Sequence, residues 1–296
     1  MERQHLFLGI DGGGTQCRAR VTDAAGRLLG RGRGGPSNTR LGVERAFREI
    51  VKAATEALSE AGLGEADLGR LHAGAGLAGL TMGCDRSEAE AHSHPFASLT
   101  MTSDAHAACL GAFGGEDGGI MVLGTGSCGC AILGGEVVTV GGWGFELANQ
   151  GSGAHAGLDA IRRALLAHEE VIPGSSLTER ILSQFEGSAE RASLWAATAE
   201  PADYGRFAGL VSELADQGDP VACDILRQSG AEASKLIKAL WNRGAERIAL
   251  VGGFSAPLRP WLDGAVQAWL VEPRGDAVDG ALILAQRALA EGQTAR

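Results

Sequence analysis

The chain has few aromatic residues and no excess of basic charge. A single tyrosine, Tyr204, and an aromatic share of 5% leave few rings for stacking on nucleic-acid bases. Its 26 lysine and arginine residues stand against 36 aspartate and glutamate residues, which gives a net charge of −10. This acidic balance argues against non-specific binding of nucleic acid and against anchoring to an anionic membrane surface.

The chain also lacks long apolar runs and any C-x-x-C pair. The first apolar run, Leu6 to Ile10, is too short for a signal peptide or a membrane span, and no later run is long enough either. The cysteines do not form the pattern of a disulfide framework. Cys128 and Cys130 form a C-x-C pair, which is either half of a metal site or, as we favour, two residues on one face of a strand. We therefore expect a cytoplasmic protein with reduced thiols.

Glycine is abundant instead, and glycine-rich turns separate the elements of a strand-and-helix pattern that occurs twice. Near the start, predicted strands over 6–10, 17–22 and 27–31 precede a helix over 42–61. After a glycine-rich break at 114–119, predicted strands over 120–123, 129–133 and 136–140 precede helices that include 256–270 and 277–290. This approximate internal duplication predicts an α/β protein with two domains, residues 1–115 and 116–296.

Each half contains a glycine turn suited to phosphate. In Asp11-Gly12-Gly13-Gly14-Thr15, backbone amides can approach an anion that a Cβ would keep away, and Asp11 is placed to hold magnesium. An ordinary glycine hairpin with an acidic edge explains this motif alone equally well. The turn Gly124-Thr125-Gly126-Ser127 occupies the matching place in the second half. The pair predicts a triphosphate held between two hairpins.

Two further motifs follow predicted buried strands. Gly252 and Gly253 would let a flat adenosine lie against the backbone, although a tight strand-to-helix turn needs the same glycines. Asp104 stands between a strand and a helix, where an aspartate commonly caps the helix N-terminus. Its position between the two phosphate turns also suits a general base that accepts the proton of an attacking hydroxyl.

These four motifs, in this order, resemble the actin-like ATPase superfamily. The triple glycine after Asp11 and the loop from Gly141 to Gly153 resemble the BadF/BadG/BcrA/BcrD-type ATPase family, and within it the N-acetylglucosamine and glucosamine kinases. The resemblance covers essentially the whole chain. It implies two RNase H-like domains, each a mixed five-stranded sheet flanked by helices, with an interdomain cleft and a last helix free to pack back on the first domain.

The resemblance also implies an activity, with ATP and Mg²⁺ as requirements. The γ-phosphoryl of ATP would pass to the 6-hydroxyl of glucosamine or N-acetylglucosamine, with Asp104 as the base and Asp11 serving magnesium. The implied nucleotide contacts are Asp11, Gly12, Gly13, Gly14, Thr15, Gly124, Thr125, Gly126, Gly252 and Gly253. The implied sugar contacts are Asn38, Asp104, Gly142, Trp143, Asn149 and Gln150. The expected partners are therefore ATP and a small amino sugar, with no nucleic acid and no membrane, and a homodimer is compatible with the resemblance.

Two departures from the family pattern leave alternatives open. Asn149 stands where the family often has an acid, and Cys128 stands where the animal N-acetylglucosamine kinase carries an asparagine near the acetyl group. The second departure leans toward free glucosamine as the substrate. One alternative is the related ATP-driven activator of a 2-hydroxyacyl-CoA dehydratase, which holds an iron–sulfur cluster through cysteines. The other is a sugar- or nucleotide-binding protein without catalysis.

Overall fold

The computed structural model describes residues 5–80 and 83–294. The chain divides into two compact units. Unit 1 comprises the residues up to Gly118, Ala131–Val137 and the residues from Glu272 onward, and unit 2 comprises Gly119–Cys130 and Val138–Val271. The chain thus leaves unit 1 after Gly118, returns to it briefly at Ala131–Val137, and returns again at Glu272 for helix α12.

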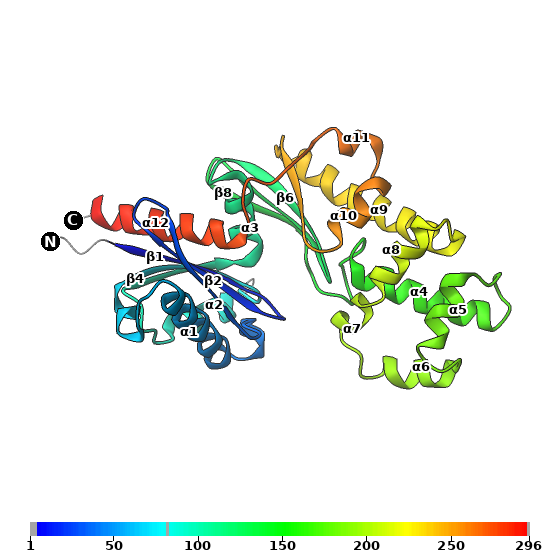
Figure 1. Cartoon of the computed structure of the whole chain (residues 1–296). Coiled ribbons are helices and arrows are strands. Elements are labelled where there is room, and N and C mark those ends of the chain that lie inside the picture. The colour runs from blue at the N-terminus through cyan, green and yellow to red at the C-terminus, as the bar shows by residue number, and fades with distance from the viewer. Residues whose placement is uncertain (1–4, 81–82, 295–296) are drawn as a thin grey trace. The chain divides into compact units, whose positions relative to one another are not determined.

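Unit 1 is built on a five-stranded sheet with the order β3-β2-β1-β4-β5. Its strands are β1 (Leu6–Gly12), β2 (Cys17–Asp23), β3 (Leu28–Gly34), β4 (Leu71–Leu77) and β5 (Ser98–Ser103). β1, β2 and β3 pair in antiparallel fashion, whereas β4 is parallel to β1 and to β5. The helices of this unit are η1 (Thr39–Leu41), α1 (Val43–Glu60), η2 (Glu65–Arg70), α2 (Gly83–Ala91), α3 (Asp104–Phe113) and α12 (Ala277–Thr294). Figure 1 shows α1 and α12 on opposite faces of the sheet.

The second sheet repeats the strand order of the first, as β10-β9-β6-β7-β8. Its strands are β6 (Gly118–Leu123), β7 (Ser127–Leu133), β8 (Glu136–Gly141), β9 (Ile248–Val251) and β10 (Leu270–Val271). The helices that follow β8 are α4 (Gly153–His168), α5 (Ser176–Ser183), α6 (Ala189–Ala196), α7 (Pro201–Gly205), α8 (Ala208–Asp216), α9 (Pro220–Trp241), α10 (Ser255–Leu258), η3 (Arg259–Trp261) and α11 (Gly264–Gln267). The prediction of two five-stranded sheets flanked by helices is confirmed.

Alternate glycines on β3 bring helix α1 close to the sheet. A Cβ on Gly30 or Gly32 would lie 2.1 or 1.9 Å from a backbone oxygen of α1, so no larger residue fits at this distance. Three glutamates of α1 use this closeness to accept hydrogen bonds from backbone amides along the outer edge, namely Glu60, Glu56 and Glu49. The edge strand is thereby covered, which prevents another strand from pairing with it.

Helix α12 covers the other face of the first sheet. A Cβ on Gly9 of β1 would lie 2.5 Å from the carbonyl oxygen of Val278, which shows how closely the helix lies on the strand. Phe7 packs with Leu282 and Ala285 in a small buried cluster under the helix. The last helix of the chain is therefore part of the core of unit 1.

The prediction of one helix over 256–270 is wrong. The structure has the short helices α10, η3 and α11 there, followed by strand β10. Pro257 and Pro260 lack the amide that a continuous helix needs, and Gly264 weakens it further, so the segment breaks into single turns. The end of the segment instead joins the edge of the second sheet, because Leu270 pairs with Ile248.

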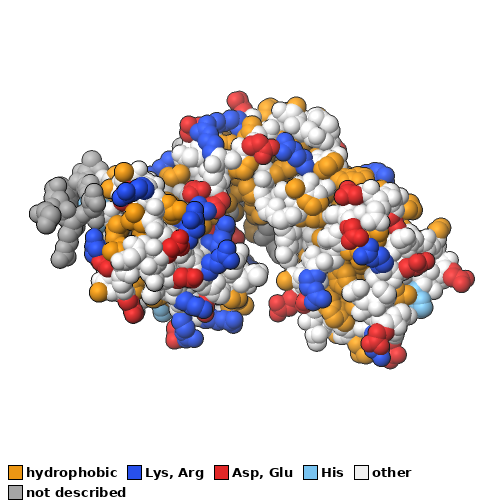
Figure 2. All heavy atoms as spheres, viewed as in Figure 1, with side chains coloured by type: hydrophobic (Ala, Val, Ile, Leu, Met, Phe, Trp, Pro, Cys, Tyr) orange, Lys and Arg blue, Asp and Glu red, His pale blue; other side chains and the backbone are white. Residues whose placement is uncertain are grey.

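The surface of each unit carries charges of both signs. Figure 2 shows lysine and arginine side chains interspersed with aspartate and glutamate on the face in view. Such mixing does not make the continuous basic stripe that tracks a nucleic-acid backbone. Among residues 5–80 and 83–294, no helix combines the length and the apolar character that crossing a membrane requires.

Candidate functional site

The turn after β1 presents free backbone amides. The amide of Gly13 donates to the carbonyl of Gln16 at 3.0 Å, which closes the turn between β1 and β2. The amides of Gly14 and Thr15 donate to no residue in the described part of the chain. Successive unpaired amides in a turn form an anion-binding concavity, so this turn suits a phosphate group.

The glycines of this turn serve two different purposes. A Cβ on Gly12 would lie 2.5 Å from Leu77, so packing inside unit 1 requires glycine there. A Cβ on Gly14 would meet no atom within 4 Å, and one on Gly13 would only touch Gln16 at 3.4 Å. Neither Gly13 nor Gly14 has a positive φ. The fold therefore does not require these two glycines, and a ligand that approaches the backbone would explain them.

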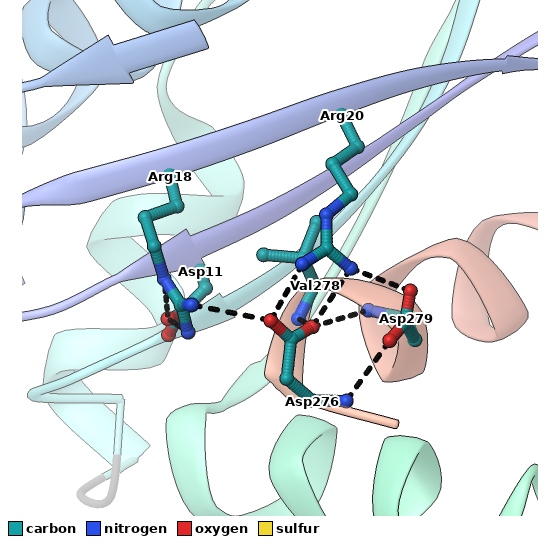
Figure 3. Close-up of polar contacts among 6 residues, drawn as sticks. All are labelled: Asp11, Arg18, Arg20, Asp276, Val278 and Asp279. Atoms are coloured by element: carbon teal, nitrogen blue, oxygen red, sulfur yellow. Dashed lines mark hydrogen bonds and ion pairs between the residues drawn. The ribbon is translucent and has the colours of Figure 1, made fainter. Parts of the chain in front are cut away.

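The carboxylate of Asp11, at the end of β1, is held by an arginine. Arg18 of β2 donates to Asp11 Oδ2 through Nη2 at 2.6 Å and through Nε at 3.0 Å (Figure 3). The side chain of Asp11 is 20% exposed, and Oδ1 accepts no hydrogen bond from the described residues. A carboxylate oxygen is the ligand that Mg²⁺ prefers, so Oδ1 fits a direct or water-mediated magnesium contact.

Asp104 occupies the first position of helix α3 without capping it. The N-cap is Ser103, whose hydroxyl accepts a hydrogen bond from the amide of His106 at 3.2 Å. Asp104 Oδ1 accepts a hydrogen bond from the amide of Ala105 at 2.8 Å, and the carboxyl group also accepts one from its own backbone amide. Since Ser103 is the cap, capping does not explain the carboxylate of Asp104.

Burial raises the pKa of Asp104, and the negative charge of Asp11 raises it further. The hydrogen bond from the Ala105 amide acts in the opposite direction but does not cancel the increase. A carboxylate with a raised pKa is a stronger base once it is ionised. Asp104 therefore has the environment of a general base.

Asn38 lies in a tight turn of the same unit. Its side-chain oxygen accepts a hydrogen bond from the amide of Arg40 at 3.0 Å, which caps the short helix η1. This bond fixes the orientation of the amide group. The amide nitrogen of the Asn38 side chain is then the atom that would serve a ligand hydroxyl.

In unit 2, a pocket of about 520 Å³ brings two of the predicted motifs together. Gly124 and Thr125 of the second glycine turn line it, as does Gly253 after β9. The amides of Thr125 and Gly126 donate to no described residue, so the turn can bind an anion. A volume in this range is typical of sites for small molecules of nucleotide size.

The glycines that flank β9 again divide into two kinds. Gly252 has a φ of +102°, and a Cβ there would lie 2.4 Å from the carbonyl oxygen of Leu123. The fold alone therefore requires glycine at 252. A Cβ on Gly253 would meet nothing within 4 Å and would point into open space, which suits the floor of a ligand pocket.

Sequence reasoning missed the far wall of this pocket. Four small residues from α7 and α8 form it, namely Gly205, Ala208, Gly209 and Ser212. Gly205 is the last residue of α7, and Ala208, Gly209 and Ser212 lie in the first two turns of α8. Small residues recur between 205 and 212, and this recurrence is the sequence signal that could have revealed the wall.

Asn149 connects the second glycine turn to the loop that follows β8. Its φ is +71°, a conformation that asparagine adopts more readily than most residues. Its side-chain oxygen accepts a hydrogen bond from the amide of Ser127 at 3.3 Å. The Ser127 hydroxyl donates in return to the carbonyl of Gln150 at 2.8 Å. Asn149 therefore turns toward the phosphate-type turn, and the side chain of Gln150 is exposed.

The remaining predicted sugar contacts lie in the same loop. Gly142 has a φ of +77°, and Trp143 is 75% exposed. Leu147 is 80% exposed. The loop thus presents large apolar side chains to solvent, an arrangement typical of a surface that a ligand or another part of a protein covers.

Known proteins resemble this chain along almost its entire length. Residues 8–285 match the model of the "BadF/BadG/BcrA/BcrD ATPase family". The glucosamine kinase GspK of Vibrio cholerae is 41% identical over 281 residues, which cover 95% of this chain and 96% of that protein. The structure of a putative N-acetylglucosamine kinase from Chromobacterium violaceum superposes with a TM-score of 0.90 at 34% identity, covering 95% of this chain and 99% of the other. A ROK family glucokinase from Streptomyces griseus shares the fold, with a TM-score of 0.53 at 20% identity, covering 95% of this chain and 98% of the other.

Proposed function

Because the chain belongs to the BadF/BadG/BcrA/BcrD ATPase family, we propose that it is an amino-sugar kinase that transfers the γ-phosphoryl of ATP to the 6-hydroxyl of glucosamine. The observation that carries the proposal is its relatedness, along nearly the whole of both chains, to the glucosamine kinase of Vibrio cholerae. The relative from Chromobacterium violaceum bears the name of an N-acetylglucosamine kinase. N-Acetylglucosamine is therefore the competing substrate.

Within unit 2, the pocket beside Thr125 and Gly253 is the proposed nucleotide site. The adenosine would lie against the small residues of α8, because they leave room for a flat ring system. The unpaired amides of Thr125 and Gly126 would receive phosphate oxygens. In unit 1, the amides of Gly14 and Thr15 are the proposed phosphate donors.

The carboxylates of unit 1 supply the chemistry. Asp104 would accept the proton of the sugar hydroxyl as its oxygen attacks the γ-phosphorus, while the bond to the bridging oxygen breaks and ADP leaves. Asp11, through Oδ1, would hold Mg²⁺. When bound, the ion would neutralise negative charge on the phosphates. Asn38, Trp143 and Gln150 are the proposed sugar contacts.

The substrate is tested by measuring ADP release with glucosamine, N-acetylglucosamine, glucose and N-acetylmuramate in parallel. We expect the highest kcat/KM with glucosamine, and a product whose phosphorus couples to the protons on carbon 6 in NMR spectra. A preference for N-acetylglucosamine would change the proposed substrate but would still support the proposed kinase activity. ADP release that no sugar stimulates would contradict the proposed function.

The link between Asn149 and Ser127 gives a further prediction. Asn149→Gly keeps the positive φ but removes the oxygen that accepts from Ser127, whereas Asn149→Asp keeps an acceptor. Loss of one such hydrogen bond costs about 1 kcal/mol, so the glycine variant should raise the ATP KM by roughly fivefold. The aspartate variant keeps the acceptor but adds a negative charge beside the turn proposed to bind phosphate, so its ATP KM should rise as well.

Steady-state kinetics in both substrates would check this prediction. If Asn149 instead contacts the sugar directly, the glycine variant raises the sugar KM and leaves the ATP KM unchanged. The aspartate variant would then also change the sugar KM, since it replaces an amide by a charge.

The dehydratase-activator alternative receives no support from the cysteines. Cys128 of β7 is partly exposed but Cys130 is fully buried, so the pair does not present two thiols to a surface where a cluster shared between subunits could bind. The purified protein is accordingly expected to be colourless. Sugar-stimulated ADP release in the assay above would exclude the non-catalytic alternative.

A further inference from the structure

We propose that Asp276 is a positioning residue, which shares the guanidinium of Arg18 with Asp11 and so leaves Asp11 enough negative charge to hold Mg²⁺. This inference rests on the proposed function, in which Asp11 serves the metal. It assigns a role to two residues, Arg18 and Asp276, that none of the sequence motifs includes.

Arg18 contacts both carboxylates at once. Its Nη2 lies 2.6 Å from Asp11 Oδ2, and its Nη1 lies 3.1 Å from Asp276 Oδ2 (Figure 3). The two aspartates are far apart in the sequence, since Asp11 ends the first strand and Asp276 immediately precedes the last helix. Only the return of the chain to unit 1 brings the second carboxylate to Arg18.

Asp276 is itself rigidly held. Its Oδ1 accepts hydrogen bonds from the amides of Val278 at 3.0 Å and Asp279 at 3.2 Å, so it caps helix α12. Arg20 donates to both of its oxygens, at 3.0 and 2.7 Å. In return, the amide of Asp276 donates to Asp279 Oδ2 at 2.9 Å. The position of this carboxylate is therefore fixed by the start of the helix.

Asp276 stays ionised in this setting. Burial opposes its ionisation, but the hydrogen bond from the Asp279 amide and the charge of Arg20 outweigh burial and keep the pKa of Asp276 below its usual value. Asp279 also pairs with Arg20, at 2.6 Å. The two arginines thus face three aspartates, so the cluster as a whole keeps one net negative charge, which is available to a cation at Asp11.

The two aspartates of α12 provide a matched pair of variants. Asp276→Asn removes the charge that faces Arg18 but keeps a good helix cap, because asparagine caps about as well as aspartate. Arg18 would then pair with Asp11 alone. Asp279→Asn removes a charge from the same helix turn, but Asp279 contacts Arg20 and not Arg18.

The test is calorimetric binding of ADP at a series of Mg²⁺ concentrations, with no sugar present. For Asp276→Asn we expect the Mg²⁺ concentration at half-maximal effect to rise about fivefold, the change that about 1 kcal/mol of altered ion pairing produces. Binding of ADP without Mg²⁺ should stay the same or tighten, because the variant carries one negative charge fewer in the cluster that includes Asp11. Asp279→Asn should shift the Mg²⁺ midpoint by less than twofold.

A purely structural role for Asp276 would weaken ADP binding with and without Mg²⁺ alike, and that result would overturn the inference. An unchanged Mg²⁺ midpoint in Asp276→Asn, or equal shifts in both variants, would overturn it too. Because sugar is absent, the result is independent of the substrate. A wild-type protein that binds ADP with Mg²⁺ but phosphorylates no amino sugar would contradict the proposed function alone.

Discussion

Replacing Asp104 by asparagine is expected to lower kcat by about 10²–10⁴-fold, because asparagine cannot accept the proton of the sugar hydroxyl. The KM values for ATP and sugar should change far less, since the size and the hydrogen bond from the Ala105 amide are retained. Steady-state kinetics on the folded variant measure both. Turnover equal to wild type would contradict the role of Asp104 as base, though not the kinase activity.

Ser103→Ala is the matched control for this variant, because Ser103 is the true cap of α3. Loss of the cap should lower the free energy of unfolding by about 0.5–2 kcal/mol while leaving kcat nearly unchanged. Asp104→Asn should do the reverse and leave stability almost intact. Together the two variants distinguish a residue that stabilises the start of α3 from a residue that takes part in catalysis.

The raised pKa of Asp104 also predicts a pH dependence. The base is active only when ionised, so wild-type kcat should fall as the pH drops through this pKa, at a higher pH than an ordinary aspartate would give. In the asparagine variant this acid limb should disappear. An acid limb that persists unchanged would belong to another group.

The second large effect is expected for Gly14→Val, which should weaken ATP binding by roughly five- to 150-fold, corresponding to about 1–3 kcal/mol for a group inserted into filled space. The valine side chain meets no protein atom near its Cβ, so the variant should fold normally. Only a ligand close to the backbone would conflict with it. Calorimetry with ADP and thermal unfolding of the same variant test both statements.

Gly64→Val is the matched control, because Gly64 also has no neighbour within 4 Å of its Cβ position and its φ is −119°. It precedes η2, away from the turn after β1. We expect it to leave ATP affinity unchanged. If both variants bind ATP as well as wild type does, the turn after β1 has only a structural role.

Local patterns in the sequence predicted much of the fold. Strands β1 and β6 are short apolar runs that end at glycine turns, and both the runs and the turns are local properties. The same holds for α1, whose apolar residues recur at helical spacing. The prediction of a helix over 256–270 was wrong because it gave more weight to the spacing of apolar residues than to Pro257 and Pro260, which interrupt a helix.

The candidate site depended more on contacts between distant segments. Glycines at 14 and 253 were visible in the sequence, but only the structure separates them from Gly12 and Gly252, which packing requires. The hydrogen bond from Ser127 to Asn149 joins the first residue of β7 to the loop that follows β8. The contact of Arg18 with Asp276 spans almost the whole chain, and no local pattern encodes it.

The place of α12 in unit 1 has a consequence for synthesis on the ribosome. Phe7 and the glycines of β1 and β4 pack against helix α12, which is translated only after unit 2. At about 5–20 residues per second, the face of the first sheet stays uncovered for many seconds after its strands have emerged. Most of unit 2 leaves the ribosome in the meantime. Unit 1 is therefore completed only after unit 2 has been made, and a nascent chain that stopped before α12 would expose apolar surface to chaperones and proteases.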